Sequence, residues 1–326
     1  MSRSRRVATE YYVRMTQRIG IDLGGTKIEG VVIDAAGGLL ARERVATPRD
    51  RYEDTVAAVA ALVTRLERDV ADRCTVGVGM PGAISPATGL VKNANSTWLN
   101  GRRFSTDLGA ALGRVVRVAN DADCFALSEA ADGAAAGAPT VFGVIVGTGT
   151  GGGVVVHQRL VSGPNAIAGE WGHNPLPWPR DEERPGPACY CGRFGCVETF
   201  LSGPAVAREY AAEAGLAPGA AGPDAAAIAA QAAAGDALAE TMMARYEDRL
   251  ARGLASIINV LDPHVIVLGG GLSNLARLYT AVPARWSHYV FSDRVDTRLV
   301  PARHGDSSGV RGAAWLWTAA EAEGDN

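Results

Sequence analysis

The amino-acid sequence predicts an α/β protein. Apolar segments typical of strands alternate along the chain with segments whose apolar residues recur at helical spacing. Glycine-rich turns follow predicted strands at three separate places, which is where α/β proteins usually bind ligands. The 326 residues exceed one average domain and suit two lobes of roughly 150 residues each. Because 47% of the residues are hydrophobic and 21% are charged, the chain has ample material for a core and is not expected to be mainly disordered.

The first half of the chain is expected to begin with a hairpin. Residues 18–34 are apolar on both sides of Gly24-Gly25, which predicts strand, tight turn and strand. Apolar residues at helical spacing predict a helix over residues 52–68. The remaining elements predicted here are a buried strand over 75–80 ending in Pro81-Gly82, a short strand over 115–119 and a helix over 124–135.

The second half is expected to contain another hairpin and a long helix. Strands are predicted over 141–146 and 153–156, around the glycine-rich turn 147–152. Residues 163–196 are rich in Pro, Gly and Trp and are predicted to form a loop. The alanine-rich residues 211–234 are expected to form surface helix and loop without chemistry. The last predicted elements are a helix over 238–261, a strand over 265–268 and a final helix that begins near Ser308 and carries Trp315 and Trp317.

Charge and cysteine content narrow the class of protein. With 32 Lys+Arg against 35 Asp+Glu the net charge is −3, which argues against a nucleic-acid-binding or membrane-surface protein. The longest uncharged stretch, residues 133–156, is broken by Pro139 and many glycines and makes a poor membrane helix. Residues 1–17 are basic without an apolar core, so they predict a disordered extension rather than a signal peptide. Five cysteines in a chain of this length do not form a disulfide framework, and a reducing, cytoplasmic location is expected.

The first glycine turn has the composition of a phosphate-binding loop. It comprises Asp22, Gly24, Gly25, Thr26 and Lys27. A Gly-Gly turn after a strand exposes backbone N–H groups that can cradle phosphate oxygens, while the hydroxyl and ammonium groups add donors. The carboxylate of Asp22 at the strand end could hold Mg²⁺. Neither a Walker A spacing nor a dinucleotide fingerprint is present, and a plain hairpin turn remains the alternative.

Two further glycine turns could complete a nucleotide site. Residues 147–153 place Thr148 and Gly149 where they could contact terminal phosphates. Gly270 and Gly271 follow the apolar run at 265–268 and open a helix, which would let an adenosine lie against the backbone. Each alone is equally well explained as a flexible turn or a strand-to-helix turn. The three turns together are much more specific than any one.

Asn120-Asp121-Ala122-Asp123 follows a predicted strand. A carboxylate at Asp121 would sit at the floor of a cleft, where it can accept a proton from a substrate hydroxyl, with Asn120 bonding neighbouring hydroxyls. The alternative is a helix cap, since Asn and Asp are favoured at that position. We prefer the capping role for Asp123 and the functional role for Asp121.

His173, Cys189, Cys191 and Cys196 form the strongest local motif. One imidazole and three thiolates at this spacing match a closed tetrahedral structural zinc site. Such a site would fix a long loop that has little core of its own. The alternative of three unligated thiols within eight residues is disfavoured. Cys74 and Cys124 are interpreted as buried apolar residues.

The same loop carries two acids near these ligands. Glu170 lies three residues before His173, and Glu198 lies two residues after Cys196. Both carboxylates could accept hydrogen bonds from sugar hydroxyls while the metal fixes their positions. The alternative is that they are solvated surface acids, which is usual for Glu.

Taken together, these motifs resemble the ROK family (repressors, open reading frames, kinases). The resemblance rests on IGIDLGGTK, GMPG, NDAD, GTGTGGG, AGEWGHNPLP and CYCGRFGCVET, and covers residues 18–317. KNANSTWLNG, GEWGHNPLPW and HGDSSGVRGAAWLW look especially like bacterial ROK fructokinases, also described as mannokinases. The family fold implies a two-lobed actin-like ATPase, each lobe ribonuclease-H-like, with an active-site cleft between the lobes. The N-terminal lobe would comprise residues 18–120 with 308–326 returning to it, and the C-terminal lobe 121–307 with a zinc loop over 163–198.

The resemblance also implies roles for individual residues. Asp121 would be the general base, with sugar contacts from Gly82, Asn120, Asp121, Glu170, His173 and Glu198. ATP and its Mg²⁺ would be held by Asp22, Gly24, Gly25, Thr26, Lys27, Thr148, Gly149, Gly270 and Gly271. His173 would use one ring nitrogen for zinc and the other for the sugar.

The resemblance predicts an ATP-dependent hexose kinase, with fructose as the first choice of substrate. Ala83-Ile84-Ser85 stands where many glucose-directed members carry an acidic or amide residue, which weakens a glucokinase assignment. Glucokinase, mannokinase and N-acetylglucosamine kinase remain alternatives. A sugar-responsive repressor is less favoured, because about seventeen residues before the first strand are too few for a DNA-binding domain. A zinc-stabilised binding module without catalysis is a second alternative. The family implies a homodimer.

Overall fold

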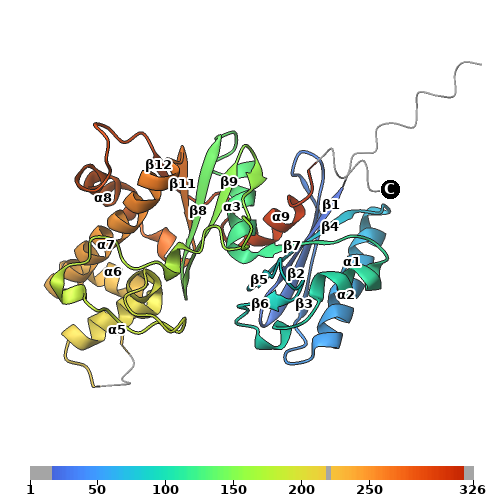
Figure 1. The fold of residues 1–326 in the computed structure, drawn as a ribbon, viewed down its shortest axis with the longest axis horizontal. Coiled ribbons are helices and arrows are strands. Elements are labelled where there is room, and N and C mark those ends of the chain that lie inside the picture. The colour runs from blue at the N-terminus through green and yellow to red at the C-terminus, as the bar shows by residue number, and fades with distance from the viewer. Residues whose placement is uncertain (1–16, 218–221, 319–326) are drawn as a thin grey trace, which may run out of the picture. The chain divides into compact units, whose positions relative to one another are not determined.

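The computed structural model describes residues 17–217 and 222–318, and the chain divides into two compact units (Figure 1). Within the described residues, unit 1 comprises residues 17–84, 88–119 and 313–318. Unit 2 comprises residues 85–87 and 120–312. The extension predicted over residues 1–17 lies, apart from Gln17, outside the described residues, as do residues 218–221 of the alanine-rich segment.

Unit 1 is built on a five-stranded sheet of order β3-β2-β1-β4-β7. Its strands are β1 (Arg18–Leu23), β2 (Lys27–Ile33), β3 (Leu39–Ala46), β4 (Thr75–Met80) and β7 (Arg117–Asn120). β1 and β2 pair antiparallel, which confirms the predicted hairpin around Gly24-Gly25. β1 pairs parallel with β4, and Ile19 lies beside Val76. The carboxyl ends of β1 and β4 therefore meet at the same edge of the sheet, next to the first glycine turn.

Helices α1 (Tyr52–Val70) and α2 (Phe104–Leu112) supply the rest of the core of unit 1. The apolar stripe of α1 runs through Val59, Leu62, Val63 and Leu66, which are fully buried, as its helical spacing predicts. Smaller elements follow β4: the two-stranded pair β5 (Ala83–Ile84) and β6 (Val91–Lys92), and a short 3-10 turn over Thr97–Leu99.

Unit 2 is built on a second five-stranded mixed sheet, of order β10-β9-β8-β11-β12. β8 (Thr140–Val146) and β9 (Thr150–Val156) form the second hairpin, and β10 (Arg159–Leu160) extends it. β11 (Val265–Gly269) pairs parallel with both β8 and β12 (Arg298–Pro301). Two α/β units with mixed sheets agree with the predicted fold class.

The sheet of unit 2 lies between helices (Figure 1). On one face, α3 (Asp121–Ala131) approaches so closely that a Cβ at Gly143 would meet the Ala126 Cβ at 2.5 Å. On the other face, Phe142, Val144 and Val146 belong to the same buried core as the apolar side chains of the long α7 (Ala237–Leu261). The remaining helices are α4 (Glu198–Leu201), α5 (Gly203–Glu213), α6 (Ala225–Ala233), α8 (Leu278–Ala281) and α9 (Ser308–Ala314).

Several predicted boundaries were wrong. The helix expected from Cys124 begins at Asp121, because Asn120 caps it by accepting a hydrogen bond from the Asp123 N–H at 2.5 Å. The strand expected over 115–119 spans Arg117–Asn120. Gly271 opens only a short 3-10 turn, Gly271–Asn274. Trp315 and Trp317 follow α9 rather than lying in it, since α9 ends at Ala314.

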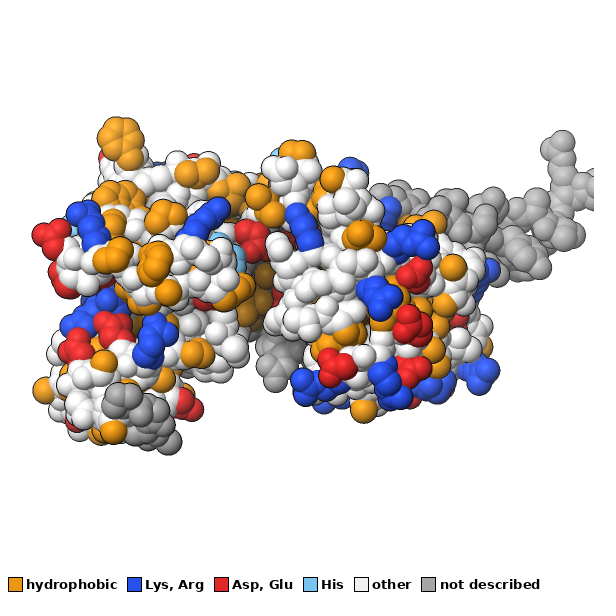
Figure 2. All heavy atoms as spheres, turned by 60° about the horizontal axis from the view of Figure 1, so that its bottom comes forward, with side chains coloured by type: hydrophobic (Ala, Val, Ile, Leu, Met, Phe, Trp, Pro, Cys, Tyr) orange, Lys and Arg blue, Asp and Glu red, His pale blue; other side chains and the backbone are white. Residues whose placement is uncertain are grey.

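The surface carries charges of both signs. On the face shown in Figure 2, Lys and Arg side chains are interspersed with Asp and Glu. None of the helices among the described residues has the length and apolar character needed to cross a membrane.

Candidate active site

Asp121 occupies the first helical position of α3, directly after β7. Its side chain is open to solvent, and Oδ1 accepts a hydrogen bond from the Ala122 N–H at 2.9 Å. The protein around the carboxyl group removes much of its water, and this desolvation raises the pKa of Asp121 against the opposing effect of backbone hydrogen bonds. An accessible carboxylate with a raised pKa is suited to accept a proton near neutral pH.

Glu198 approaches the second glycine turn, at the start of α4. Its Oε2 accepts a hydrogen bond from the Thr150 N–H at 2.9 Å. A Cβ at position 149 would meet the same oxygen at 2.6 Å, so Gly149 leaves room for the Glu198 carboxylate. Within unit 2, the structure therefore places Glu198, which is predicted to bind the sugar, against the second glycine turn, which is predicted to bind phosphate.

Glu170 lies near the amino end of α3. Its charge, together with that of Asp121, acts on the carboxyl group of Asp123. The loop is fixed here by Trp171, which is 3% exposed and whose indole N–H donates to the Gly151 carbonyl at 2.9 Å. Gly172 packs so tightly that an added Cβ would meet the Thr150 carbonyl oxygen at 1.9 Å. Sequence reasoning missed this anchor, although a tryptophan beside a predicted ligand was a usable signal.

His173, Cys189, Cys191 and Cys196 come together as predicted, with all four ligand atoms within 4.8 Å of one another. The His173 Nδ1 lies 3.6 Å from the Cys189 sulfur, and the Cys191 and Cys196 sulfurs are 3.6 Å apart. Burial and then the neighbouring thiols of Cys191 and Cys189 raise the pKa of the Cys196 thiol to about 12. One imidazole and three sulfur atoms this close together are the donor set of a structural Zn²⁺ site, so the residues present fit that metal.

The second ring nitrogen of His173 has a protein partner. Nε2 lies 2.9 Å from the Tyr190 hydroxyl, and the two rings meet edge to face with centroids 5.1 Å apart. Tyr190 is 83% exposed. The nitrogen that we expected to face a sugar is thus occupied by a tyrosine that sequence reasoning did not single out, although it lies between two predicted metal ligands.

The second and third glycine turns lie side by side at the carboxyl ends of β8 and β11. Gly270 has a φ of 81°, and a Cβ there would meet the Val146 carbonyl oxygen at 2.4 Å, so glycine is needed on both counts. A Cβ built on Gly147 would lie 3.9 Å from the Gly271 nitrogen. Thr148, Gly270 and Gly271 are exposed, which leaves their polar groups accessible to a ligand.

Unit 1 holds the other predicted site residues. The turn between β1 and β2 is closed by a hydrogen bond from the Gly24 N–H to the Lys27 carbonyl at 3.0 Å. Thr47 braces it by donating its hydroxyl to the Gly24 carbonyl at 2.7 Å. Gly25, Thr26 and Lys27 are exposed, and Asp22 is half-buried at the end of β1. Gly82 has a φ of 80°, and a Cβ there would meet the Lys92 carbonyl oxygen at 2.5 Å.

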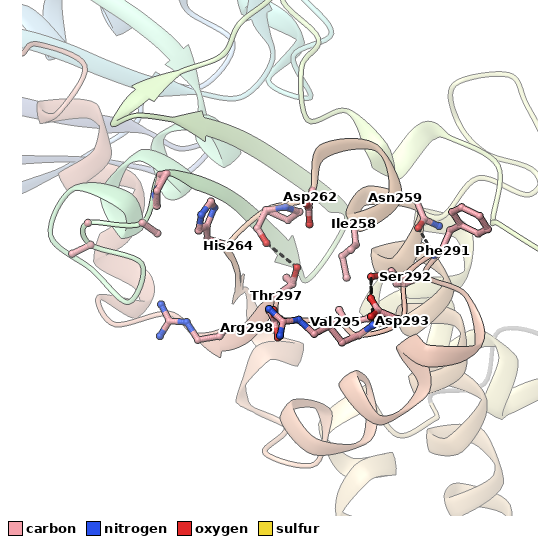
Figure 3. A pocket seen from close by; sticks show the side chains of 18 residues that line it. Ile258, Asn259, Asp262, His264, Phe291, Ser292, Asp293, Val295, Thr297 and Arg298 are labelled. Carbon is pink, nitrogen blue, oxygen red and sulfur yellow. Dashed lines mark hydrogen bonds and ion pairs between the residues drawn. The ribbon is translucent and has the colours of Figure 1, made fainter.

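A groove of about 930 Å³ in unit 2 lies away from the predicted site residues (Figure 3). It is found at the amino-terminal ends of the strands, since His264 precedes β11 and Arg298 begins β12. Ligands of α/β proteins bind at the carboxyl ends, where the glycine turns lie. The glycine turns that the sequence predicts to bind a nucleotide therefore lie at the opposite ends of these strands from this groove.

Known proteins resemble the chain over most of its length. The family model described as ROK family matches residues 18–320. An N-acetyl-D-glucosamine kinase of Photobacterium profundum is 40% identical over 301 residues, which cover 91% of this chain and 98% of the relative. The corresponding kinase of Vibrio cholerae is also 40% identical, with the same coverage.

Solved structures of ROK proteins also resemble the chain over most of its length. A ROK hexokinase of Thermus thermophilus is 32% identical with a TM-score of 0.81, covering 92% of this chain and 97% of the other. A ROK glucokinase of Streptomyces griseus, solved with glucose and AMPPNP, is 28% identical with a TM-score of 0.70, covering 92% and 98%. The family match, the relatives at 40% identity and the shared fold together establish that this chain belongs to the ROK family.

Proposed function

We propose that this chain is an ATP-dependent sugar kinase that phosphorylates N-acetyl-D-glucosamine. The observation that carries the proposal is the 40% identity, across nearly the whole of both chains, to proteins named N-acetyl-D-glucosamine kinase. Fructose, the first choice from the sequence, is not the substrate named for these relatives, so we replace it with the alternative.

Asp121 is proposed as the general base. It would accept the proton of the attacking sugar hydroxyl while that oxygen bonds to the γ-phosphorus of ATP and the bond to ADP breaks. Its solvent-open carboxylate and raised pKa support this role. Gly82, Asn120, Glu170 and Glu198 are proposed to orient the sugar. His173 would join them by exchanging the Tyr190 hydroxyl at its Nε2 for a sugar hydroxyl.

The glycine turns are proposed to hold the nucleotide. Gly25, Thr26 and Lys27 of the first turn are exposed, as are Thr148, Gly270 and Gly271 of the other two. The N–H groups of each turn can serve as donors for phosphates and ribose. Asp22 would hold the Mg²⁺ that accompanies ATP, since a carboxylate at the end of a strand is a typical ligand for that ion. When bound, the ion neutralises phosphate charge.

The cluster of His173, Cys189, Cys191 and Cys196 is proposed to hold one structural Zn²⁺. Four protein ligands close the coordination sphere, so the ion would stabilise the loop and take no part in the reaction. The loop needs such support because Tyr190, Cys191, Gly192 and Arg193 are all exposed.

A substrate panel tests the proposal. ADP formation is measured with N-acetylglucosamine, glucose, mannose and fructose under one set of conditions, with a sugar-free reaction as the control. We expect kcat/KM for N-acetylglucosamine to exceed that for each other hexose by at least ~10-fold, because a site that bonds an amide group rejects sugars lacking it. A preference for fructose or glucose would overturn the substrate assignment, and sugar binding without ADP formation would overturn the kinase assignment.

A further inference from the structure

Asp123 lies two residues beyond Asp121, at the third position of α3, and forms a reciprocal cap with Asn120. Its N–H donates to the Asn120 side-chain oxygen at 2.5 Å, and its carboxyl group accepts the Asn120 N–H in return. This arrangement fixes the backbone on both sides of Asp121. Asp123 is thus connected to the proposed base through the backbone of the first turn of α3. Unlike Asp121, it is not exposed.

The second oxygen of the Asp123 carboxyl group is unusual. Oδ1 is shielded from solvent and has no hydrogen-bond partner among the described residues. An ionised carboxylate oxygen in that position would be desolvated without compensation, which is costly. A neutral carboxyl group, with its proton on Oδ1, avoids most of that cost.

The negative charges near Asp123 also favour the neutral form of its carboxyl group. Asp121 on the same helix and Glu170 from the loop are the titratable groups that act on Asp123. The adjacent strand β9 contributes only backbone at Gly153, whose added Cβ would lie 3.0 Å from the Asp123 Cα. Burial, then Glu170, then Asp121 raise the pKa of Asp123 to about 8.

We propose that Asp123 is a positioning residue that works as a neutral carboxylic acid, holding the Asn120 cap beneath Asp121 without adding a third negative charge to the site. Ionisation would place an uncompensated anion on Oδ1, which must then recruit water or turn away from the Asn120 N–H. Either response moves the first turn of α3 and brings extra negative charge near the site for an anionic phosphoryl group. This inference rests on the proposed kinase function.

The test compares the wild-type chain with Asp123→Asn, which keeps an oxygen for the cap but cannot ionise. Asp123→Ser is the second neutral variant, and Asp69→Asn, an exposed acid on α1, is the matched control. kcat and KM for N-acetylglucosamine are measured from pH 6.5 to 9.5 at saturating ATP and Mg²⁺, and each protein is referred to its own value at pH 7.

In the wild type and Asp69→Asn, we expect kcat to fall above about pH 8 and to approach a ~10-fold loss per pH unit, as for a single ionisation. In Asp123→Asn that fall should be displaced by at least about one pH unit. Coincident alkaline profiles in the wild type and both neutral variants would overturn the proposal.

A second measurement separates this inference from the proposed function. The pKa of Asp123 is raised in the folded state, so the wild type should lose stability as pH rises toward about 8. Asp123→Asn should lose less, because only Asp121 then contributes in this way. Thermal unfolding without substrate from pH 6 to 9 tests this even if no sugar is phosphorylated. If neither variant folds, infrared spectra of Asp121→Asn decide, because Asp121 then cannot contribute to the signal: a protonated carboxyl band at pH 7 that disappears by pH 9 supports the proposal, and its absence at pH 7 overturns it.

Discussion

At the scale of single residues, the two acids at the start of α3 differ through their surroundings. Asp121 faces solvent at the first helical position, whereas Asp123 turns one carboxyl oxygen into the protein. Both carboxyl groups have a raised pKa because of desolvation, but only Asp121 is exposed. One turn of helix therefore carries both the proposed proton acceptor and the residue that caps the helix beside it.

Replacement of Asp121 by Asn should lower kcat by at least ~10²-fold, the usual contribution of a general base. The amide keeps the shape of the side chain, so the unfolding temperature should change little. The wild-type kcat should fall as pH drops through the pKa of Asp121, and this acid limb should vanish in the residual activity of the variant. Asp69→Asn serves as the control. Near-normal turnover by a folded Asp121→Asn protein would show that Asp121 is not the general base.

At the scale of elements, the loop before α4 is attached to unit 2 at three places. One is Trp171, which bonds to Gly151 of β9, and another is the cluster of His173 and three cysteines that is proposed to bind metal. The third is Glu183, which is 4% exposed and receives hydrogen bonds from Arg249 at 2.7 Å and from Arg252 at 2.8 Å, both on α7. Arg252 also donates to the Trp178 carbonyl at 2.8 Å. Along the chain, the proposed metal ligand His173 thus lies between Trp171 and Glu183, and the contacts of these two residues do not depend on a metal.

Glu183→Ala should destabilise unit 2 by about 3–5 kcal/mol, because it leaves two buried guanidinium groups without their shared carboxylate. Glu182→Ala, an exposed neighbour, is the matched control. Burial alone would raise the pKa of Glu183, but the bonds from Arg252 and Arg249 outweigh it and lower the pKa to about 2. The carboxylate therefore contributes stability above about pH 4.5 that is lost as pH falls toward 2. Denaturant titrations at pH 7 and pH 3 measure the loss of stability in Glu183→Ala and its dependence on pH. Equal free energies of unfolding for Glu183→Ala and Glu182→Ala would show that Glu183 does not anchor the loop.

Loss of the metal should loosen the loop locally. We expect Cys191→Ser to retain much less Zn²⁺ than the one ion per chain expected for the wild type, and to show faster hydrogen exchange over residues 186–196. Exchange over residues 176–183 should change less, because Glu183 and Arg252 still hold that part. Metal analysis and hydrogen exchange test this, with Cys74→Ser as the control. An unchanged zinc content in Cys191→Ser would eliminate this ligand.

At the scale of the whole molecule, the sequence predicted strongly periodic segments well and contacts between distant segments poorly. The bounds of α1, β4 and α7 were predicted to within two residues, because the spacing of their apolar residues follows from the side that each turns to the core. β3 was missed because its exposed face carries Arg42 and Arg44, which pair with the buried Glu29 across the sheet. The metal cluster was predicted because its ligands crowd into a short segment. The Tyr190–His173 contact and the Glu183 anchor were not, because each depends on how loops fold back.

The last described residues of unit 1 come from the far end of the chain. The family resemblance implies this return, whereas the spacing of the residues does not predict the contacts that they make. Trp317 is 2% exposed, and its indole N–H donates to the Val76 carbonyl of β4 at 2.8 Å. Arg117 of β7 stacks on the Trp317 ring at 4.1 Å and donates to the Leu316 carbonyl at 2.7 Å. A Cβ at Gly77 would meet the Ala313 carbonyl oxygen at 1.9 Å, so β4 carries glycine where this segment crosses it. Residues 313–317 therefore pack on β4 and β7 and cover this part of the sheet of unit 1.

Trp317→Ala should consequently destabilise unit 1 by about 3–5 kcal/mol, as for the loss of a buried aromatic side chain. Hydrogen exchange should accelerate in β1 and β4 and stay close to the wild-type rate in β8 and β11, because those strands belong to unit 2. Trp178→Ala, at a tryptophan that is 48% exposed in unit 2, is the control and should leave the protection of β1 and β4 unchanged. Equal acceleration in both sheets would instead mean that the two units unfold as one, and the terminal segment would then stabilise the whole chain rather than the sheet it touches.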